Sequence, residues 1–169
     1  MIRDIEKSKD LDKVLKQLPG GAFLTVKNDN EVNTMTIGWA NFGIVWGKPI
    51  LMVAVRKSRY THKLISKAQD FAVSVPVEID LDKELDYCGT HSGRNENKIK
   101  KCKLHLTESK SILSPIVKEC DYHYECKIVY SQFMDQSALD SSIKDQYYAD
   151  DDYHVLYFGE IVESYKYDE

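Results

Sequence analysis

The sequence predicts a mainly-β fold, and two observations support this prediction. Short apolar or alternating segments, bounded by Gly, Pro, Asn and Asp, recur along the chain in the manner of strands. The helical segments between them are few and short, and they do not alternate regularly with the strands. Since a doubly wound α/β sheet requires that alternation, we expect a closed or half-closed β-barrel of six or seven strands with two or three short helices.

The first half of the chain supplies a helix, a hairpin and buried strands. Residues 3–18 carry apolar side chains at helical spacing, and Pro19-Gly20-Gly21 ends that helix. A hairpin turn is expected at Asn28-Asp29-Asn30 and a second helix at 59–69. Strands are expected at 22–26, 32–40, 49–55 and 71–77.

The second half begins with a helix at 80–88, for which Asp80 is a candidate cap. Residues 89–98 contain no large apolar side chain and are expected to form a polar loop. Strands are expected at 103–107, 119–130 and 153–165, with a break at Ser114-Pro115. Residues 131–152 are polar and acidic.

Bulk composition excludes several classes of function. The 169 residues suit one domain, which we place over residues 1–169. A net charge of −4 and a pI of about 5.8 argue against a general nucleic-acid binder, which needs a broad cationic surface. The longest apolar run, 49–55, is far shorter than the about 20 residues of a membrane span. Residues 1–7 have mixed charge and no apolar signal region, so we expect a cytoplasmic protein without membrane or nucleic-acid partners.

The four cysteines form no C-x-x-C pair, and in a cytoplasmic chain we expect them to be reduced. A metal site from Cys120, His123 and Cys126 is conceivable from composition. In a strand, however, Cys120 and Cys126 share one face and His123 points to the other. No metal site is therefore predicted.

A basic island is the most informative feature of this acidic chain. Residues 56–63, with the sequence RKSRYTHK, carry four formal positive charges and no carboxylate. They lie between a buried strand and a helix, where cations are disfavoured by the helix dipole. A docked phosphate would reverse this, because backbone N–H groups, the hydroxyls of Ser58 and Thr61, and the guanidinium groups of Arg56 and Arg59 could converge on it. The alternative is a solvated basic turn in which Ser58 is an ordinary N-cap.

A second unusual segment is 33–49, which is rich in small residues and contains two tryptophans. Glycines in strands allow a flat ligand to approach the backbone, and Thr36 adds a hydroxyl. Trp39 and Trp46 offer broad apolar walls. The alternative is a strand, a turn and two core tryptophans.

The third segment is the polar loop that follows the helix at 80–88. Gly89 and Gly93 free its backbone, and Arg94 and Lys98 bring positive charge. The alternative is a mobile loop of ordinary turn residues. In that interpretation His91 is a solvent-exposed histidine and Cys88 is a packing residue at the helix end.

Taken in their order along the chain, the three segments resemble the flavin reductase-like FMN-binding proteins, the split-barrel group that includes the flavoredoxins. The matching residues are Asn33-x-Met35-Thr36-Ile37-Gly38-Trp39 with Trp46-x-Lys48-Pro49, Arg56-x-Ser58-Arg59-Tyr60-Thr61, and Tyr87-Cys88-Gly89-x-x-Ser92-Gly93-Arg94 with Lys98. The resemblance runs from about Pro19 to the end of the chain. It implies a six-stranded, Greek-key-like split barrel, non-covalently bound FMN, and a homodimer with flavin near the subunit interface.

The resemblance also implies which residues surround the flavin. Those around the phosphate are Arg56, Lys57, Ser58, Arg59 and Thr61. Those along the isoalloxazine ring are Thr36, Ile37, Gly38 and Trp39. Those that close over the ring or the ribityl chain are Cys88, Gly89, Thr90, Ser92, Gly93 and Lys98.

The implied chemistry is hydride transfer from NADH or NADPH to flavin N5, for which no catalytic side chain is obligatory. This agrees with a chain that has no evident triad or carboxylate pair. Lys98 near the N1/O2 edge would stabilise negative charge on reduced flavin. Three functions stay open: an NAD(P)H-dependent flavin reductase, a flavoredoxin-like electron carrier supplied by a redox protein partner, and a non-catalytic FMN-binding module. No G-x-G-x-x-G motif follows a strand, so no separate dinucleotide domain is expected.

Overall fold

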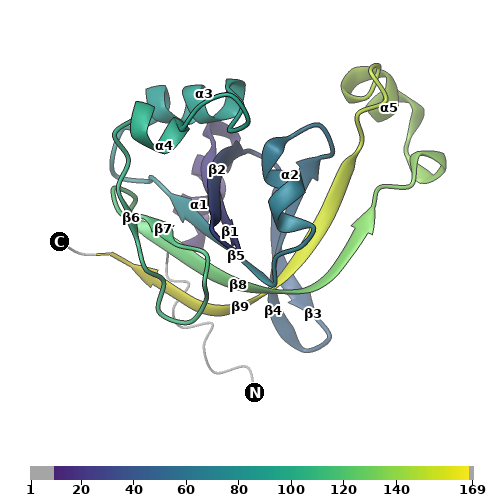
Figure 1. The fold of residues 1–169 in the computed structure, drawn as a ribbon. Helices are drawn as coiled ribbons and strands as arrows, with labels where there is room; N and C mark the ends of the chain where they lie inside the picture. Colours follow the sequence, from purple (N-terminus) through teal and green to yellow (C-terminus); the bar gives the residue numbers. More distant parts are fainter. Residues whose placement is uncertain (1–9, 168–169) are drawn as a thin grey trace.

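One antiparallel sheet of seven strands dominates the computed structural model, which describes residues 10–167 (Figure 1). Its strands lie in the spatial order β2-β1-β5-β8-β9-β4-β3. They are β1 (Ala22–Asn28), β2 (Glu31–Ile37), β3 (Ala40–Val45), β4 (Lys48–Arg56), β5 (Asp70–Val75), β8 (Tyr122–Phe133) and β9 (His154–Lys166). Two short strands, β6 (Leu106–Thr107) and β7 (Ile116–Val117), form a separate pair.

The helices are short and lie between the strands. They are α1 (Leu11–Gln17), α2 (Tyr60–Ile65), α3 (Asp82–Thr90), α4 (Lys98–Lys101) and α5 (Ser141–Tyr147), with 3₁₀ turns at Leu18–Gly20 and Gln136–Ala138. In Figure 1, α2 lies between the β1–β2 side of the sheet and the long β8–β9 pair. Helices α3 and α4 lie beside β2, so α2, α3 and α4 gather around one side of that strand.

The mainly-β prediction is confirmed, with a seventh strand in the large sheet. The strand expected at 32–40 ends at Ile37, and a separate strand β3 begins at Ala40. Trp46 and Gly47 both have positive φ, 54° and 67°, and they turn β3 back against β4. The prediction of one continuous strand was wrong because Gly38 and Trp39 leave the ladder, although the Trp39 carbonyl accepts the Ala54 N–H at 3.2 Å.

Other boundaries differ by a few residues. The helix expected at 59–69 is shorter, and the one expected at 80–88 begins and ends two residues later. Its N-cap position is Leu81 and not Asp80, although the Asp80 carboxylate accepts the Asp82 N–H at 3.1 Å. The loop expected at 89–98 is shorter, because its first two residues belong to α3 and its last residue belongs to α4. Within the helix expected at 3–18, residues 3–9 lie outside the described residues.

Helix α5 lies inside the segment expected to be only polar and acidic. None of its residues is buried, so the segment lacks the apolar periodicity that predicts helices. Its start is fixed by the Asp140 carboxylate, which accepts the Ser142 N–H at 2.9 Å.

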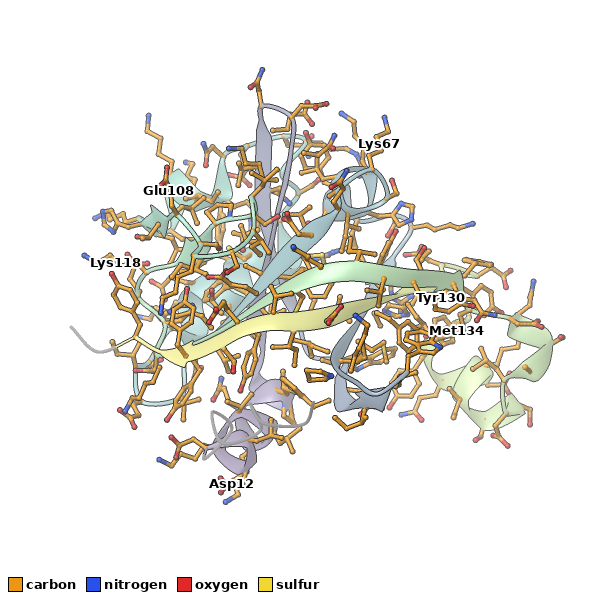
Figure 2. The ribbon with its side chains drawn as sticks, turned by 90° about the horizontal axis from the view of Figure 1, so that it is seen from below. Asp12, Lys67, Glu108, Lys118, Tyr130 and Met134 are labelled. Carbon is orange, nitrogen blue, oxygen red and sulfur yellow. The ribbon has the colours of Figure 1, made fainter. Side chains whose placement is uncertain are left out.

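Strands β8 and β9 extend beyond the core and carry α5 at their far end (Figure 1). The first residues of β8 are buried, whereas its last residues are exposed. The register with β9 shifts between Glu125 and Cys126 and again between Ile128 and Tyr130, which bends the pair. Figure 2 shows Tyr130 and Met134 toward the end of this ribbon that bears α5.

A close approach of three strands requires glycine at position 159 of β9. A Cβ atom at Gly159 would lie 2.6 Å from Cys126 Cβ and 2.6 Å from Phe71 Cζ. Both neighbours are fully buried, in the core formed by β5 and β8. The long ribbon therefore packs onto the sheet only because this side chain is absent.

We predict that Gly159→Ala lowers the free energy of unfolding by about 2 kcal/mol, because the added methyl overpacks a closed core. Gly43→Ala is the matched control: Gly43 is also in a strand, but nothing lies within 4 Å of its added Cβ. The control should stay within about 0.5 kcal/mol of the natural chain in urea unfolding. Equal effects of the two substitutions would contradict this account of the packing.

Candidate functional site

Two cavities, of about 140 Å³ and about 250 Å³, share Met35 and Arg59 in their walls. The first is polar and lies where the β4–α2 turn faces the loop after α3. It is lined by Asn33, Met35, Ser58, Arg59, Tyr60, Thr61, Thr90, His91, Ser92, Gly93, Arg94 and Lys98. The second is lined by Met35, Thr36, Ile37, Gly38, Trp39, Ala54, Arg56, Arg59, Gly89 and His154. The three segments singled out in the sequence therefore meet at one place.

Hydrogen bonds hold the walls of the first cavity together. Arg94 Nη1 donates to the Ser58 carbonyl at 2.9 Å, which ties the loop to the basic turn. Asn33 Nδ2, from β2, donates to Thr61 Oγ1 at 2.8 Å. Because Thr61 accepts this bond, its own hydroxyl proton remains available for another acceptor.

Gly93 lets the loop come close to its neighbours. A Cβ atom at this position would overlap Asn33 Oδ1 and lie 2.7 Å from Tyr60 Cδ1. The loop backbone therefore lies directly against β2 and α2, where any larger residue would displace it. This close packing explains why residue 93 is a glycine.

Positive charge in the first cavity is not balanced by any acidic wall residue. Arg59 donates to the Gly89 carbonyl at 2.5 Å, and burial and the neighbouring Arg56 lower its pKa. Lys98 is only 3% exposed, its Nζ donates to the Cys88 carbonyl at 2.9 Å, and burial lowers its pKa to about 8. Among the described residues, none that lines either cavity is Asp or Glu. A bound anion would relieve the repulsion between these cations.

The second cavity has a larger apolar share and is bounded by an aromatic group. The Trp39 ring is 4.7 Å from the His154 ring and 5.1 Å from the Tyr147 ring, centroid to centroid. Gly38 and Ala54 present no large side chain beside it. Thr36 is oriented by a bond from its Oγ1 to the Leu85 carbonyl. Such a space suits a flat, mostly apolar ring system.

His154 belongs to this wall and was missed by sequence reasoning. Its Nδ1 lies 2.8 Å from the Tyr148 hydroxyl, and burial lowers its pKa to about 4, so the imidazole is neutral at pH 7. The residue is far along the chain from the other wall residues, and only the β4–β9 pairing, which aligns Arg56 with His154, brings it here. The one available signal was a polar residue among apolar ones on a strand.

Two predicted site residues do not reach either cavity. Lys57 turns away, and its Nζ lies 3.8 Å from the centroid of the Phe133 ring on β8. The Cys88 side chain is fully buried in a second apolar cluster with Phe23 and Leu85, and this burial raises the pKa of its thiol to about 12. Only the carbonyl of Cys88 points to the site, through Lys98.

Two further predicted residues are present but engaged differently. The guanidinium of Arg56 bonds to the Tyr147 carbonyl at 2.8 Å and the Asp152 carbonyl at 2.9 Å. The amide and hydroxyl of Ser58 both bond to the Asp152 carboxylate. The N-cap position of α2 is Arg59, without a side-chain cap, so the alternative role of Ser58 as an N-cap is wrong.

The alternative of two core tryptophans is also wrong. Trp39 is 41% exposed beside the second cavity, and Trp46 is 60% exposed at the β3–β4 turn. Trp46 lines neither cavity.

Residues 10–167 contain neither a metal-binding cluster nor a membrane-spanning helix. In that part of the chain, no group of three or more His, Cys, Asp or Glu side chains is placed to hold a metal ion. The helices described there are all too short or too polar to cross a membrane.

A polar cavity with several cations thus lies beside a more apolar cavity in a mainly-β protein, and this arrangement would suit an anionic ligand with a flat ring. Comparison with known proteins is more specific. Residues 17–168 match the flavin reductase like domain family, and the chain therefore belongs to that family.

Individual proteins share part of the sequence or the fold of this chain. An uncharacterized protein of Archaeoglobus fulgidus is 40% identical over 111 residues, which are 66% of this chain and 62% of that protein. The crystal structure of flavoredoxin from Methanosarcina acetivorans has a TM-score of 0.67 at 24% identity, covering 88% of this chain and 68% of that one. The NADH:FAD oxidoreductase of Streptomyces globisporus has a TM-score of 0.62 at 20% identity, covering 94% of this chain and 84% of that one. These structures establish the shared fold.

The buried ammonium of Lys98 predicts a dependence of stability on pH. Its pKa is about 8 in the folded chain against 10.5 ordinarily, so between these values the unfolded chain binds more protons and stability rises with pH. From pH 7 to 9.5 this group should add about 2 kcal/mol to the free energy of unfolding. The gain should be present in the natural chain and absent in Lys98→Met.

The control is Lys101→Met, which removes an exposed lysine from the same helix α4. Urea unfolding at both pH values measures all three proteins. A pH response of Lys98→Met equal to that of the natural chain would show that Lys98 is not desolvated.

Proposed function

We propose that the protein binds FMN non-covalently and acts as an NAD(P)H-dependent flavin oxidoreductase. One observation supports this most strongly: this acidic chain forms a cavity walled by Arg59, Arg94 and Lys98, to which none of residues 10–167 contributes a carboxylate, and a more apolar cavity adjoins it. The FMN phosphate would occupy the first cavity and the isoalloxazine ring the second. Membership of the flavin reductase like family supports the same ligand.

The residues present fit this ligand at both ends. At the phosphate, the guanidinium groups of Arg59 and Arg94 and the hydroxyls of Thr61 and Ser92 would donate to oxygens. At the ring, Gly38 would admit the flat surface and Trp39 would cover part of it.

When bound, FMN supplies the hydride and electron chemistry, and the protein supplies binding, orientation and charge. Lys98 lines the first cavity and not the second, so its buried ammonium would stabilise the negative charge of the phosphate rather than charge on the ring. His154 is neutral and held by Tyr148, so it would present an uncharged imidazole to the ring cavity.

The second candidate is an electron carrier that receives electrons from a protein partner. It is supported by an exposed apolar face at the β3–β4 hairpin, where the Trp46 ring lies 6.0 Å from the Tyr130 ring on the β8–β9 ribbon, centroid to centroid. The same face could instead be buried between the two subunits of a homodimer. We propose a homodimer as the assembly and the cytoplasm as the location. Light scattering of the purified protein measures the assembly directly.

Absorbance spectroscopy separates the two functions. The FMN-loaded protein would be mixed anaerobically with NADH and then NADPH while the flavin band near about 450 nm is followed. Rapid bleaching with either nucleotide supports the oxidoreductase. A band that persists with both, but bleaches with a reduced ferredoxin-type protein, supports the carrier. A band that persists with all three leaves the non-catalytic module, and absence of FMN binding refutes the proposal.

The position of the phosphate leads to a prediction that compares two cations. Arg94→Gln should weaken FMN binding about 10- to 100-fold, because a charge-assisted bond to phosphate is lost. Lys57→Gln should change it less than about threefold, since Lys57 lies over Phe133 outside the cavities. Fluorescence titration with FMN measures both.

Riboflavin, which lacks the phosphate, is the control ligand for the same titration. Neither substitution should alter its affinity much. Equal loss of FMN affinity in both variants would contradict this position. It would show that the general positive charge of the region, and not direct contact in this cavity, attracts the phosphate.

A further inference from the structure

The carboxylate of Asp152 occupies donors that a phosphate at the basic turn would use. Its Oδ1 accepts the Ser58 N–H at 3.2 Å and its Oδ2 accepts the Ser58 hydroxyl at 2.5 Å. An acceptor with two oxygens on an amide and a hydroxyl has the same hydrogen-bonding pattern as one edge of a phosphate. Asp152 therefore resembles an internal anion placed at this turn.

Asp152 belongs to a short acidic segment, residues 147–152, which runs from the last residue of α5 toward β9 and which we call the strap. Arg56 at the end of β4 holds it through the Tyr147 and Asp152 carbonyls and, at 3.4 Å, through Asp150 Oδ1. The strap thus engages a cation and two hydrogen-bond donors of the island that the sequence assigns to phosphate. Residues 150–152 are all aspartates, so the strap brings concentrated negative charge to an otherwise cationic turn.

The strap also borders the second cavity. The Tyr147 ring packs against Trp39 at 5.1 Å, and the Tyr148 hydroxyl bonds to His154. Both Trp39 and His154 line that cavity. A movement of the strap away from Ser58 would therefore change both ends of the site together.

We propose that Asp152 competes with the phosphate of the flavin for Ser58, so that the strap sets how tightly the phosphorylated ligand is held. This inference rests on the proposed function. Two anions cannot share the same amide and hydroxyl, and their mutual repulsion opposes simultaneous binding. Phosphate binding then displaces the Asp152 carboxylate, while Arg59 and Arg94 hold the other oxygens. Riboflavin has no group that competes with the carboxylate.

The test compares two isosteric variants of the strap. Asp152→Asn removes the charge but keeps an oxygen that can accept the Ser58 N–H. Asp150→Asn removes an equal charge from the same strap at a residue with no bond to Ser58. Dissociation constants for FMN and for riboflavin are measured by fluorescence titration, and thermal unfolding confirms that each variant is folded.

Asp152→Asn should bind FMN about tenfold more tightly than the natural chain, with riboflavin affinity unchanged within about twofold. Asp150→Asn should gain less than about threefold for FMN, because it weakens only the 3.4 Å contact with Arg56 and leaves the bonds between Asp152 and Ser58 in place. Trypsin cleavage after Lys144, in the helix that leads into the strap, should accelerate when FMN is added to the natural chain and should not respond to riboflavin.

Unchanged or weaker FMN binding by Asp152→Asn would overturn the competition and make Asp152 a support of the turn. An equal gain in Asp150→Asn would overturn it as well, because charge alone would then explain the effect. If all three proteins bind FMN equally, only the competition fails. If none binds FMN, the proposed function fails with it.

Discussion

The cations at the junction of the β4–α2 turn and the loop after α3 impose the constraint on which the site depends. Lys98 is almost fully buried, Arg59 is largely so, and Arg94 bridges the two segments through the Ser58 carbonyl. In the described residues no carboxylate lines either cavity to balance them. Such an arrangement costs stability in the empty protein, and it favours a ligand that carries negative charge.

The fold provides this junction through pairings between distant parts of the chain. Strand β2 contributes Asn33, which fixes Thr61 at the start of α2. The β4–β9 ladder sets His154 opposite Arg56, and the long β8–β9 ribbon carries the strap back to the turn. Gly159 allows that ribbon to lie against Phe71 and Cys126. The polar cavity, the apolar cavity and the strap are thus positioned by the same few strands.

Local patterns in the sequence predicted most of the strands. They also singled out the three segments that form the cavities. The break at Gly38 and Trp39 was not predictable from alternation, since the apolar character continues through it. Helix α5 was missed because it buries nothing, and only the cap at Asp140 marks its start. Both errors arise where tertiary contacts or capping, rather than hydrophobic periodicity, decide the local structure.

The site residues show the same division. The resemblance implied all four of Lys57, Cys88, Gly93 and Lys98, but only Gly93 and Lys98 line the polar cavity, and the side chains of Lys57 and Cys88 face elsewhere. His154 and Asp152 could not be found because their neighbours lie about 100 residues away. The packed sheet decides toward which side of a turn a lysine points. It also decides which distant strand lies beside that turn.

Phosphorus NMR of protein-bound FMN tests most directly whether the phosphate lies among these cations. Free FMN phosphate loses its second proton near a pKa of about 6. We expect the bound resonance to be shifted from that of free FMN and to remain that of the dianion down to about pH 5, because Arg59 and Arg94 stabilise the doubly charged form. A bound resonance that titrates near pH 6, as in free solution, would contradict the account and place the phosphate in solvent.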